Sequence, residues 1–501
     1  MQSAPVTSPS SEGLPEAALP SPPPWPGPAL PCAHPDRMGL FGALHGLATA
    51  DVRGARVLEI GCREGNNLLP LAATWPGASF VGLEADPALA VAAAERARAA
   101  GLGNVSILGG GVAAFASPGA PELGAFDYVV AHGVLARLPE AERGALWGLI
   151  RRALAPHGMA LVTFDTWPGH HVLEPIRRLM RYHTEAIPDP EARIQQARAI
   201  ARFHVRRWHQ VHGPTRGVLQ QRLLGELDAL SDAELERELL GPEVHPAFFE
   251  DAVAEAAAHE LTWVANARAS EPRLRWMPSS IRAFLAGVDD MARQQQYMDF
   301  FVDQRFRTSL FCRADAPLRR QAHVDEFMGL FVAPRPDVDA ADEAMRPRAP
   351  ASPRPSSQAL WLLERVVAPL TRPTRADELV ARAVAEGFPG QPFEAKVAVT
   401  ELFFADLIEL ARTPAPVLAR RLEADTRPLA TSLARLAASQ GAVSVTSLWH
   451  RDVLLLEVER QALARCDGAT TADVIVEAVG PDGGDALEAL QRHGFLCEPG
   501  A

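Results

Sequence analysis

The chain has 501 residues, too many for a single hydrophobic core, so two to four domains are expected. Its 61 acidic and 49 basic residues give a formal net charge of −12, which argues against broad binding to nucleic acid or to anionic membranes. Five scattered cysteines form no Cys-x-x-Cys pair, so neither a disulfide framework nor a metal site is expected.

The sequence shows no evident targeting or membrane-spanning segment. No apolar run reaches the ~18 residues that span a bilayer, and no basic stretch followed by an apolar one opens the chain. We therefore expect a cytoplasmic protein. Residues 1–33 are rich in Pro, Ser, Ala and Gly, a composition that buries little apolar surface and predicts disorder.

A strand, a glycine-rich turn and a second strand come next. The apolar run Val57–Ile60 leads into Gly61 and Gly65, and the apolar run Phe80–Leu83 ends in Glu84. Glycines let a backbone approach a ligand closely, and an acid about 20 residues on can accept hydrogen bonds from two ribose hydroxyls. The pattern therefore predicts a nucleotide-binding βαβ unit. The alternative is an ordinary strand, turn and helix without a ligand.

The glycine spacing distinguishes two cofactors. A dinucleotide site needs Gly-x-Gly-x-x-Gly, because its pyrophosphate lies against bare amides. Here Glu59 precedes the first glycine, and this acid would repel a diphosphate but attract an ammonium group. S-adenosylmethionine carries an amino group and a sulfonium where NAD carries phosphates. The pattern favours S-adenosylmethionine, with Glu59 near its methionyl end and Glu84 at its ribose.

Strands and helices alternate up to about residue 165. Further strands are expected at Val105–Leu108, Tyr128–Ala131 and Met159–Phe164, and longer helices at Pro87–Ala100 and Glu140–Leu154. This alternation predicts an α/β fold with a doubly wound, Rossmann-like parallel sheet, which binds ligands beyond the carboxyl ends of its strands. That edge would gather Gly61–Gly65, Glu84, Ala131–Val134 and Asp165–Gly169 around one cleft.

Beyond residue 175, strand signals become rare and helical periodicity dominates. Helices are expected at Ile176–His183, Glu191–His209, Gly217–Leu230, Ala247–Glu260 and Ile281–Arg305. We predict an α/β domain over 34–175, a helical middle domain over 176–333 and a Pro-rich linker over 334–356. Residues 357–501 begin with three helices and are expected to form a winged-helix-like module. It is acidic and has no basic cluster, so we expect docking to protein rather than binding to nucleic acid.

Several short motifs together resemble one family. They are His34-Pro35-Asp36-Arg37-Met38, Gly61 to Leu68, Phe126 to Val134, Thr166-Trp167-Pro168-Gly169, Gln296 to Phe300 and Arg305 to Thr308. In this combination the chain is similar to class I S-adenosylmethionine-dependent methyltransferases that carry a methyltransferase regulatory domain. That family includes bacterial protein-lysine methyltransferases of outer-membrane proteins. The resemblance covers roughly residues 34–500.

The resemblance implies a role for each matched position. The expected cofactor-binding residues are Glu59, Gly61, Cys62, Gly65, Asn67, Glu84, Ala85 and Ala131. The expected catalytic residues are His132 and Asp165: the carboxylate would orient an acceptor amine and the imidazole would relay its proton. Each has a simpler alternative, since His132 could be a buried histidine bonded to backbone and Asp165 could cap the helix that begins near Pro168.

Four departures from the family pattern leave the acceptor open. Arg63 stands at an expected glycine, and Gly109-Gly110-Gly111 replaces an acid at the adenine amine. Leu135-Ala136-Arg137 replaces Tyr-Ser-Trp, and Phe164-Asp165 replaces Tyr-Asn. The leading hypothesis is an S-adenosylmethionine-dependent enzyme that methylates a protein lysine. The alternatives are a small-molecule N- or O-methyltransferase, and a methyltransferase-like interaction protein with weak or lost catalysis.

Overall fold

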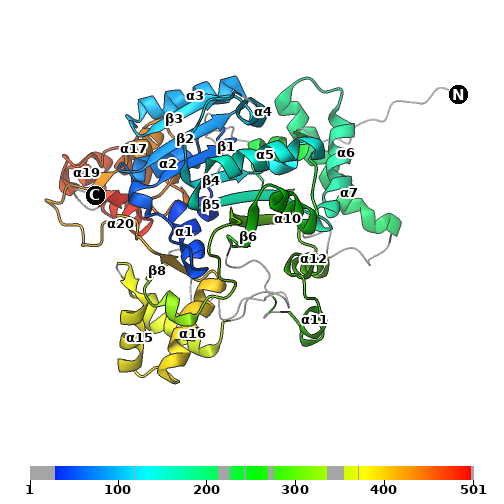
Figure 1. Ribbon diagram of the computed structural model, residues 1–501. Helices are drawn as coiled ribbons and strands as arrows, with labels where there is room; N and C mark the ends of the chain where they lie inside the picture. Colours follow the sequence, from blue (N-terminus) through cyan, green and yellow to red (C-terminus); the bar gives the residue numbers. More distant parts are fainter. Residues whose placement is uncertain are drawn as a thin grey trace.

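A central sheet carries helices on both faces, and further groups of helices lie around it (Figure 1). The computed structural model describes residues 29–117, 119–212, 225, 227–228, 230–241, 244–268, 274, 277–335, 355–370 and 372–497. Residues 1–28, most of the expected helix Gly217–Leu230 and most of the predicted linker 334–356 lie outside the described residues.

The sheet has seven strands in the order β3-β2-β1-β4-β5-β7-β6. Their bounds are Arg56–Ile60 (β1), Ser79–Glu84 (β2), Val105–Gly109 (β3), Phe126–His132 (β4), Leu154–Asp165 (β5), Leu261–Asn266 (β6) and Phe306–Arg313 (β7). Strands β1 to β5 are all parallel, with the order reversing between β1 and β4. The expected doubly wound parallel sheet is thus confirmed.

Alternate residues of each central strand belong to two different apolar cores. Val57 and Val130 point into the core under α1 (Pro35–Leu44) and α2 (Leu68–Thr74), whereas Leu58 points into the core under α5 (Glu140–Ala153). This follows from the period of two in an extended chain, whose side chains leave the sheet on opposite faces. Both faces are covered, so the strands consist almost entirely of buried residues.

The strands β6 and β7 come from the segment 176–333, where mainly helices were expected. Strand β7 pairs antiparallel with both β5 and β6, so β6 forms the edge of the sheet on this side. The sequence analysis did not predict β7, because three of its buried residues are polar, namely Arg307, Thr308 and Ser309. A strand with buried polar positions lacks the apolar run that identifies a buried strand in sequence.

The helices of this segment lie largely where expected. The observed helices include α6 (Glu174–Thr184), α7 (Pro190–His212) and α10 (Phe249–Ala258). The single helix expected over Ile281–Arg305 is instead two helices, α11 (Ser279–Leu285) and α12 (Met291–Val302). The break arises because the Asp290 carboxylate accepts a hydrogen bond from the Arg293 amide at 2.7 Å and so begins a new helix.

Residues 29–33, the end of the segment predicted to be disordered, are folded. They include a 3₁₀ turn, η1 (Pro31–Ala33), in which Cys32 and Ala33 are buried. The Leu30 amide donates to Asn67 Oδ1 at 3.2 Å and the Ala29 amide donates to Asp452 Oδ2 at 3.2 Å. Compositional bias could not reveal these bonds, because both acceptors are distant in sequence.

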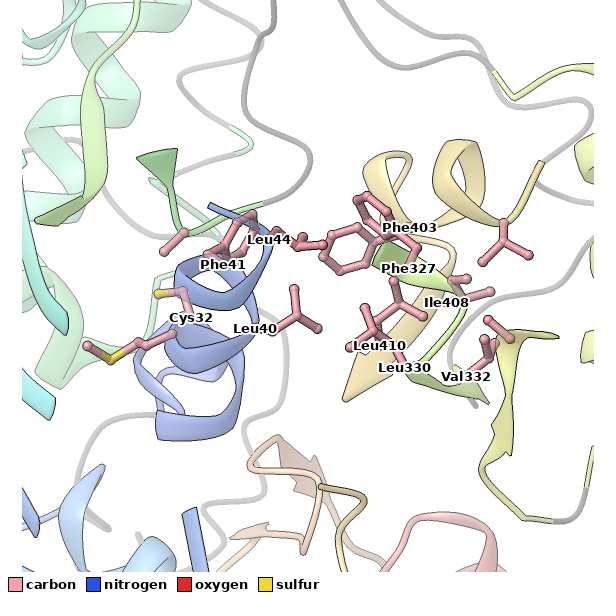
Figure 2. Packing of buried hydrophobic residues seen from close by; sticks show 14 of the residues in the cluster. Cys32, Leu40, Phe41, Leu44, Phe327, Leu330, Val332, Phe403, Ile408 and Leu410 are labelled. Carbon is pink, nitrogen blue, oxygen red and sulfur yellow. The ribbon is translucent and has the colours of Figure 1, made fainter. Parts of the chain in front are cut away.

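Helix α1 connects the sheet to a group of helices that follows residue 355. These are α14 (Ser357–Leu362), α15 (Ala376–Ala385) and α16 (Pro392–Phe404), with a three-stranded sheet of β8 (Phe331–Pro334), β9 (Thr374–Arg375) and β10 (Ile408–Ala411). Figure 2 shows Leu40, Phe41 and Leu44 of α1 facing Phe327 and Phe403 in one continuous apolar cluster. The core of the central sheet therefore continues into this helical group.

The C-terminal part forms its own small core and rests on the central domain. It contains α17 (Ser432–Ser439), the hairpin of β12 (Ser444–Thr446) and β13 (Asp452–Leu454), α18 (Glu457–Leu463), α19 (Ala472–Val479), α20 (Gly483–Arg492) and the pair β11 (Leu429–Ala430) with β14 (Leu496–Cys497). Leu433 of α17 packs against Leu69 of α2 and Ala97 of α3 (Pro87–Ala99). Figure 1 accordingly shows α17 next to α2 and α3.

Candidate active site

A cavity of about 490 Å³ opens at the carboxyl ends of β1, β2 and β4. This is the point where the strand order reverses, the usual ligand position in an open α/β sheet, and the volume suits a small-molecule site. Its walls come from the loop after β1, the end of β2, the loop after β3 and the segment after β4: Ile60, Gly61, Arg63, Leu83, Glu84, Ala85, Gly110–Ala113, His132–Val134, Arg137, Leu138, Glu142 and Ala145.

The loop after β1 is a left-handed turn held close to its neighbours. Gly61 has φ 77° and Gly65 has φ 78°, a region that favours glycine. A Cβ at Gly61 would stand 2.9 Å from Val134 Cγ2, so a side chain there would meet the wall of the cavity. Arg63, where the family has glycine, also adopts a left-handed conformation, with φ 50°. The backbone path is therefore kept despite the substitution.

Glu84 is held rigidly at the cavity wall. Its Oε2 accepts a hydrogen bond from the Arg63 amide at 2.7 Å, and its Oε1 accepts one from the Asp86 amide at 2.9 Å. An ionised carboxylate offers about four acceptor positions, so two remain for other donors. This arrangement suits a pair of ribose hydroxyls, and Ala85 lies beside it on the same wall.

Glu59 and Asn67 lie deeper than the cavity wall and are bonded to each other. Both are about 4% exposed, and Asn67 Nδ2 donates to Glu59 Oε2 at 3.3 Å. Burial raises the pKa of Glu59 to about 8, the Asn67 hydrogen bond opposes this shift and the charge of Glu84 adds to it. A cation such as an amino group would stabilise the ionised form of this buried acid and would therefore bind favourably beside it.

Cys62, Gly65 and Ala131 support the site rather than line it, among the residues that the structure describes. Cys62 is buried, and its Sγ would be 2.6 Å from a Cβ added at Gly82. Burial raises the pKa of the Cys62 thiol, which therefore stays protonated. The side chain of Ala131 is fully buried in the core on one face of the sheet, so any cofactor contact of this residue must come from its backbone.

His132 points into the cavity at the end of β4. Its Nδ1 lies 2.8 Å from Thr163 Oγ1, and the same hydroxyl accepts a hydrogen bond from the Gly133 amide at 2.8 Å. The ring also stacks edge-on against Phe306, with 5.9 Å between centroids. His132 is half-buried and bonded to the Thr163 side chain, so the simpler alternative of a fully buried histidine does not describe it.

Asp165 ends β5 and pairs with a histidine that the sequence analysis did not select. His170 Nδ1 lies 3.3 Å from Asp165 Oδ1, and His170 Nε2 lies 3.4 Å from Glu174 Oε2. The residue before the 3₁₀ turn Gly169–Val172 is Pro168, and the Asp165 carboxylate bonds the His170 ring instead of serving as that residue. The only sequence signal for this pairing was the spacing of five residues across a turn.

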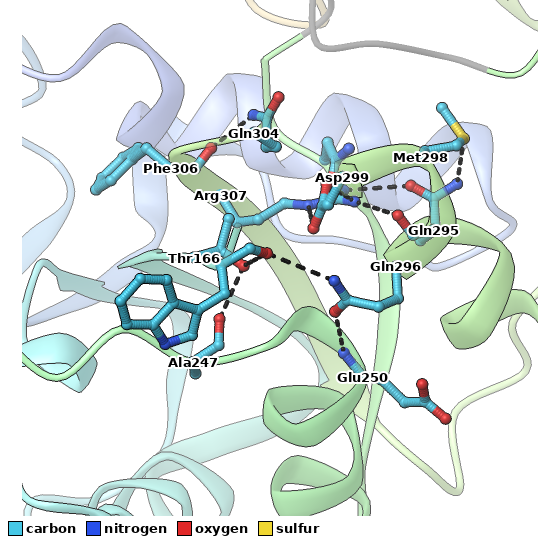
Figure 3. Close-up of polar contacts among 12 residues, drawn as sticks. Thr166, Ala247, Glu250, Gln295, Gln296, Met298, Asp299, Gln304, Phe306 and Arg307 are labelled. Carbon is cyan, nitrogen blue, oxygen red and sulfur yellow. Dashed lines mark hydrogen bonds and ion pairs between the residues drawn. The ribbon is translucent and has the colours of Figure 1, made fainter. Parts of the chain in front are cut away.

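The loop from Asp165 to Gly169 is fixed by the middle segment of the chain. Thr166 Oγ1 donates to the Ala247 carbonyl at 2.8 Å. Gln296 connects both sides, since its Nε2 donates to the Trp167 carbonyl at 3.5 Å and its Oε1 accepts from the Glu250 amide at 3.2 Å (Figure 3). The motifs 166–169 and 296–300, far apart in sequence, are therefore two halves of one contact.

A buried ion pair holds the strand next to this loop. Arg307 of β7 donates to Asp299 of α12 at 2.6 and 3.1 Å, and also to Asn266 Oδ1 at 3.2 Å (Figure 3). Burial raises the pKa of Asp299 to about 6, while Arg307 opposes that shift. Within the Arg305-Phe306-Arg307 run, Arg307 is thus an ion-pairing structural residue.

A second, more polar cavity of about 670 Å³ lies behind the same loop. Its walls carry the four acids Glu140, Glu174, Asp251 and Glu255, the bases Arg143 and Arg178, and the rings of Trp167, His170, His245 and Phe248. With histidines neutral, four acids against two bases leave this cavity with a net charge of −2. Such a surface attracts basic groups.

Three protein-family models match separate parts of the chain. A methyltransferase domain matches residues 58–160, a predicted methyltransferase regulatory domain matches residues 231–313, and a PKMT C-terminal winged helix domain matches residues 426–481. These matches agree with the family resemblance found in the sequence. The winged helix falls on α17 to α19 and the hairpin β12–β13, within the later half of the module expected over 357–501.

Two curated sequences are similar to part of this chain. An uncharacterised protein of Rickettsia prowazekii is 30% identical over 293 residues, covering 58% of this chain and 52% of that protein. An uncharacterised protein of Synechocystis is 23% identical over 302 residues, covering 60% of this chain and 59% of that protein. The chain thus spans little more than half the length of these two curated relatives.

Two solved structures share the fold along nearly the whole chain. PKMT2 from Rickettsia typhi superposes with a TM-score of 0.79 at 19% identity, covering 94% of this chain and 100% of that one. Its complex with AdoHcy superposes with a TM-score of 0.78 at 20% identity and the same coverage. The arrangement of sheet, middle segment and C-terminal helices is therefore shared with that protein.

Proposed function

We propose that this chain, which joins a methyltransferase domain to a methyltransferase regulatory domain and a PKMT winged helix, is an S-adenosylmethionine-dependent protein-lysine methyltransferase. The observation that carries the proposal is Glu84, whose carboxylate is fixed by two backbone amides at the wall of the cavity beside the Gly61 turn. The similar protein PKMT2 has been solved with AdoHcy, the product form of this cofactor.

The residues present fit this cofactor. Glu84 offers free acceptor positions to ribose hydroxyls, and Glu59 is a buried acid behind the turn where an amino group would lie. When bound, the cofactor supplies an activated methyl group on its sulfonium. The protein must then align the acceptor with that methyl and keep water away from both, since an in-line displacement depends mainly on proximity and orientation.

A lysine acceptor must lose its proton first, because a free lysine amine has a pKa near ~10.4. Asp165 and His170, 3.3 Å apart, lie at the end of β5 beside the acidic second cavity. We infer that the carboxylates of that cavity attract a basic segment of the acceptor protein, while Asp165 orients the amine and His132 receives its proton. Acidic side chains and aromatic rings line the same cavity, and both bind a cationic side chain better than an uncharged small molecule.

Two measurements test the proposal. Calorimetry should detect binding of S-adenosylhomocysteine to the purified chain and no binding of NAD. Transfer of a radiolabelled methyl group is then measured onto a bacterial lysate and onto the same lysate after proteolysis. Label that becomes acid-soluble after proteolysis indicates a protein acceptor.

The chain offers an unusually clean control for self-labelling. Lys396 is its only lysine, and it pairs with Asp325 at 2.7 Å on the surface. In a Lys396→Arg variant, every labelled lysine must therefore come from another protein. Label confined to small molecules would favour the small-molecule alternative. Cofactor binding with no label in any fraction would identify a methyltransferase-like interaction protein.

A further inference from the structure

The turn of the β12–β13 hairpin reaches from the winged-helix part of the chain to the cofactor loop. His450 lies in this turn, is 2% exposed and has a left-handed backbone with φ 56°. Its Nε2 lies 2.6 Å from Asn67 Oδ1. Asn67 immediately precedes α2 at the end of the glycine turn, 383 residues earlier in the chain.

The hydrogen-bond directions in this contact are determined by a third group. The Leu30 amide also donates to the Oδ1 position of Asn67, at 3.2 Å. Because an amide N–H needs an acceptor, this atom must be the carbonyl oxygen, and His450 Nε2 must carry the proton it shares. The Asn67 NH₂ group is thereby turned toward Glu59, to which it donates at 3.3 Å.

The hairpin is also anchored by the two residues that follow His450. Arg451 pairs with Glu409, which in turn pairs with Arg37 of α1 at 3.2 Å. Asp452 accepts a hydrogen bond from the Ala29 amide at 3.2 Å. His450 is therefore held in place by its neighbours, and its ring packs edge-on against His34 at 5.6 Å between centroids.

We propose that His450 is a positioning residue of the cofactor site, through which the C-terminal winged helix holds Asn67 and Glu59 in the orientation that receives the amino group of the cofactor. The inference rests on the proposed function for its ligand. It makes the winged helix part of the support of the cofactor loop, although His450 and Asn67 lie 383 residues apart in the chain. His450, in the turn of this hairpin, is buried against the rest of the chain through its contact with Asn67.

Two substitutions separate positioning from mere packing. His450→Asn suits a left-handed backbone but is too short to reach Asn67, whereas His450→Gln keeps an N–H donor at a comparable reach. We expect His450→Asn to weaken S-adenosylhomocysteine binding on the order of tenfold, as loss of one buried hydrogen bond to a binding group would. His450→Gln should restore affinity to within about threefold of the original chain.

The control is His493→Asn, at the end of α20 in the same part of the chain. Calorimetry is done well below the unfolding temperature of every variant, so that a purely structural effect lowers that temperature without changing affinity. Equal affinity in His450→Asn and the original chain overturns the proposal. So does an affinity loss in His450→Gln as large as in His450→Asn.

Hydrogen exchange gives a readout that needs no cofactor. The peptide covering residues 61–69 should exchange faster in His450→Asn than in His493→Asn, because the turn that Asn67 anchors is loosened. If the original chain binds no S-adenosylhomocysteine, the proposed function fails, and exchange alone decides the positioning role. Unchanged exchange in His450→Asn then overturns it.

Discussion

Two buried acids, Glu59 and Glu84, lie near the carboxyl ends of β1 and β2 and differ in their hydrogen-bond partners. Glu84 accepts a hydrogen bond from a backbone amide at each of its carboxylate oxygens. Glu59 is bonded to one side-chain amide, and burial raises its pKa to about 8. Glu84 is therefore suited to accept hydrogen bonds from neutral hydroxyl groups. Glu59 is suited to bind a cation, which would favour the ionised form of its carboxyl group.

Substitution of Glu84 tests the ribose contact. Glu84→Ala should weaken S-adenosylhomocysteine binding by about 1–3 kcal/mol, the scale of hydrogen bonds to a charged group. Calorimetry on the folded variant measures the loss. Asp86→Ala is the matched control, because it keeps the backbone amide that donates to Glu84. Unchanged affinity in Glu84→Ala would remove this residue from the site.

The raised pKa of Glu59 predicts how stability depends on pH. Between the unfolded value of 4.5 and the folded value of about 8, the folded state holds a proton that the unfolded state has lost. The free energy of unfolding should therefore fall as the pH rises across this window. Chemical denaturation of the unliganded chain from pH 5 to 9 measures the slope. Glu59→Gln should flatten it and also weaken cofactor binding; an unchanged slope would contradict the prediction.

Asp165 is the residue on which the acceptor hypothesis depends. Asp165→Ala should lower turnover by about 100-fold while cofactor affinity stays nearly constant, because misplacement of a reacting group typically costs on the order of 10²-fold. Asp165→Asn should be milder if only a hydrogen bond is required. Steady-state kinetics and calorimetry on the same samples separate the two effects. A loss of thermal stability with unchanged turnover per folded molecule would leave Asp165 a purely structural role.

At the scale of elements, the loop from Asp165 to Gly169 is held in place by segments that lie more than 80 residues later in the chain. Strand β7 lies antiparallel against β5, and α12 then presents Gln296 to the loop that β5 ends in. The regulatory-domain match, residues 231–313, thus supplies two strands of the sheet as well as the support of the loop. A change in α12 would be transmitted directly to Trp167.

Gln296 offers a test of this support. Gln296→Ala removes a hydrogen bond from the Glu250 amide and one from the Trp167 carbonyl, which keeps the bond from the Thr166 hydroxyl. This loss should cost about 1–3 kcal/mol of stability. Turnover should fall while S-adenosylhomocysteine affinity is kept. Gln294→Ala, on the same helix, loses a bond to Leu285 instead and serves as the control. If both variants lose turnover equally, the loop contact has no special role.

At the scale of the whole molecule, separate apolar cores are joined by long-range contacts. The core around α1 extends from the central sheet to α16, and the C-terminal core touches α2 through Leu433. None of the helices in the described residues is long and apolar enough to cross a bilayer. The predicted boundaries at residues 34, 176, 334 and 357 remain a proposal for how these units divide the chain.

Limited proteolysis tests those boundaries. The composition of residues 334–356 predicts cleavage there, and that of the first 28 residues predicts trimming at the N-terminus. Cutting should stop before Ala29, whose amide is bonded to Asp452 in the C-terminal part. Mass spectrometry of the fragments locates the sites. A chain that resists cleavage over 334–356 would show that this stretch is packed as structure.

The sequence by itself determined the fold class and the cofactor end of the site. The glycine turn, the acid that ends β2 and the alternation of strands and helices are local patterns, and local patterns follow from backbone sterics and periodicity. Only the tertiary structure decided that β6 and β7 complete the sheet, that His170 meets Asp165, and that His450 meets Asn67. The reason is physical. These contacts join residues that lie across a turn or hundreds of residues apart in the chain. Burial of a polar group such as Arg307 becomes favourable only once its hydrogen-bond partners are in place.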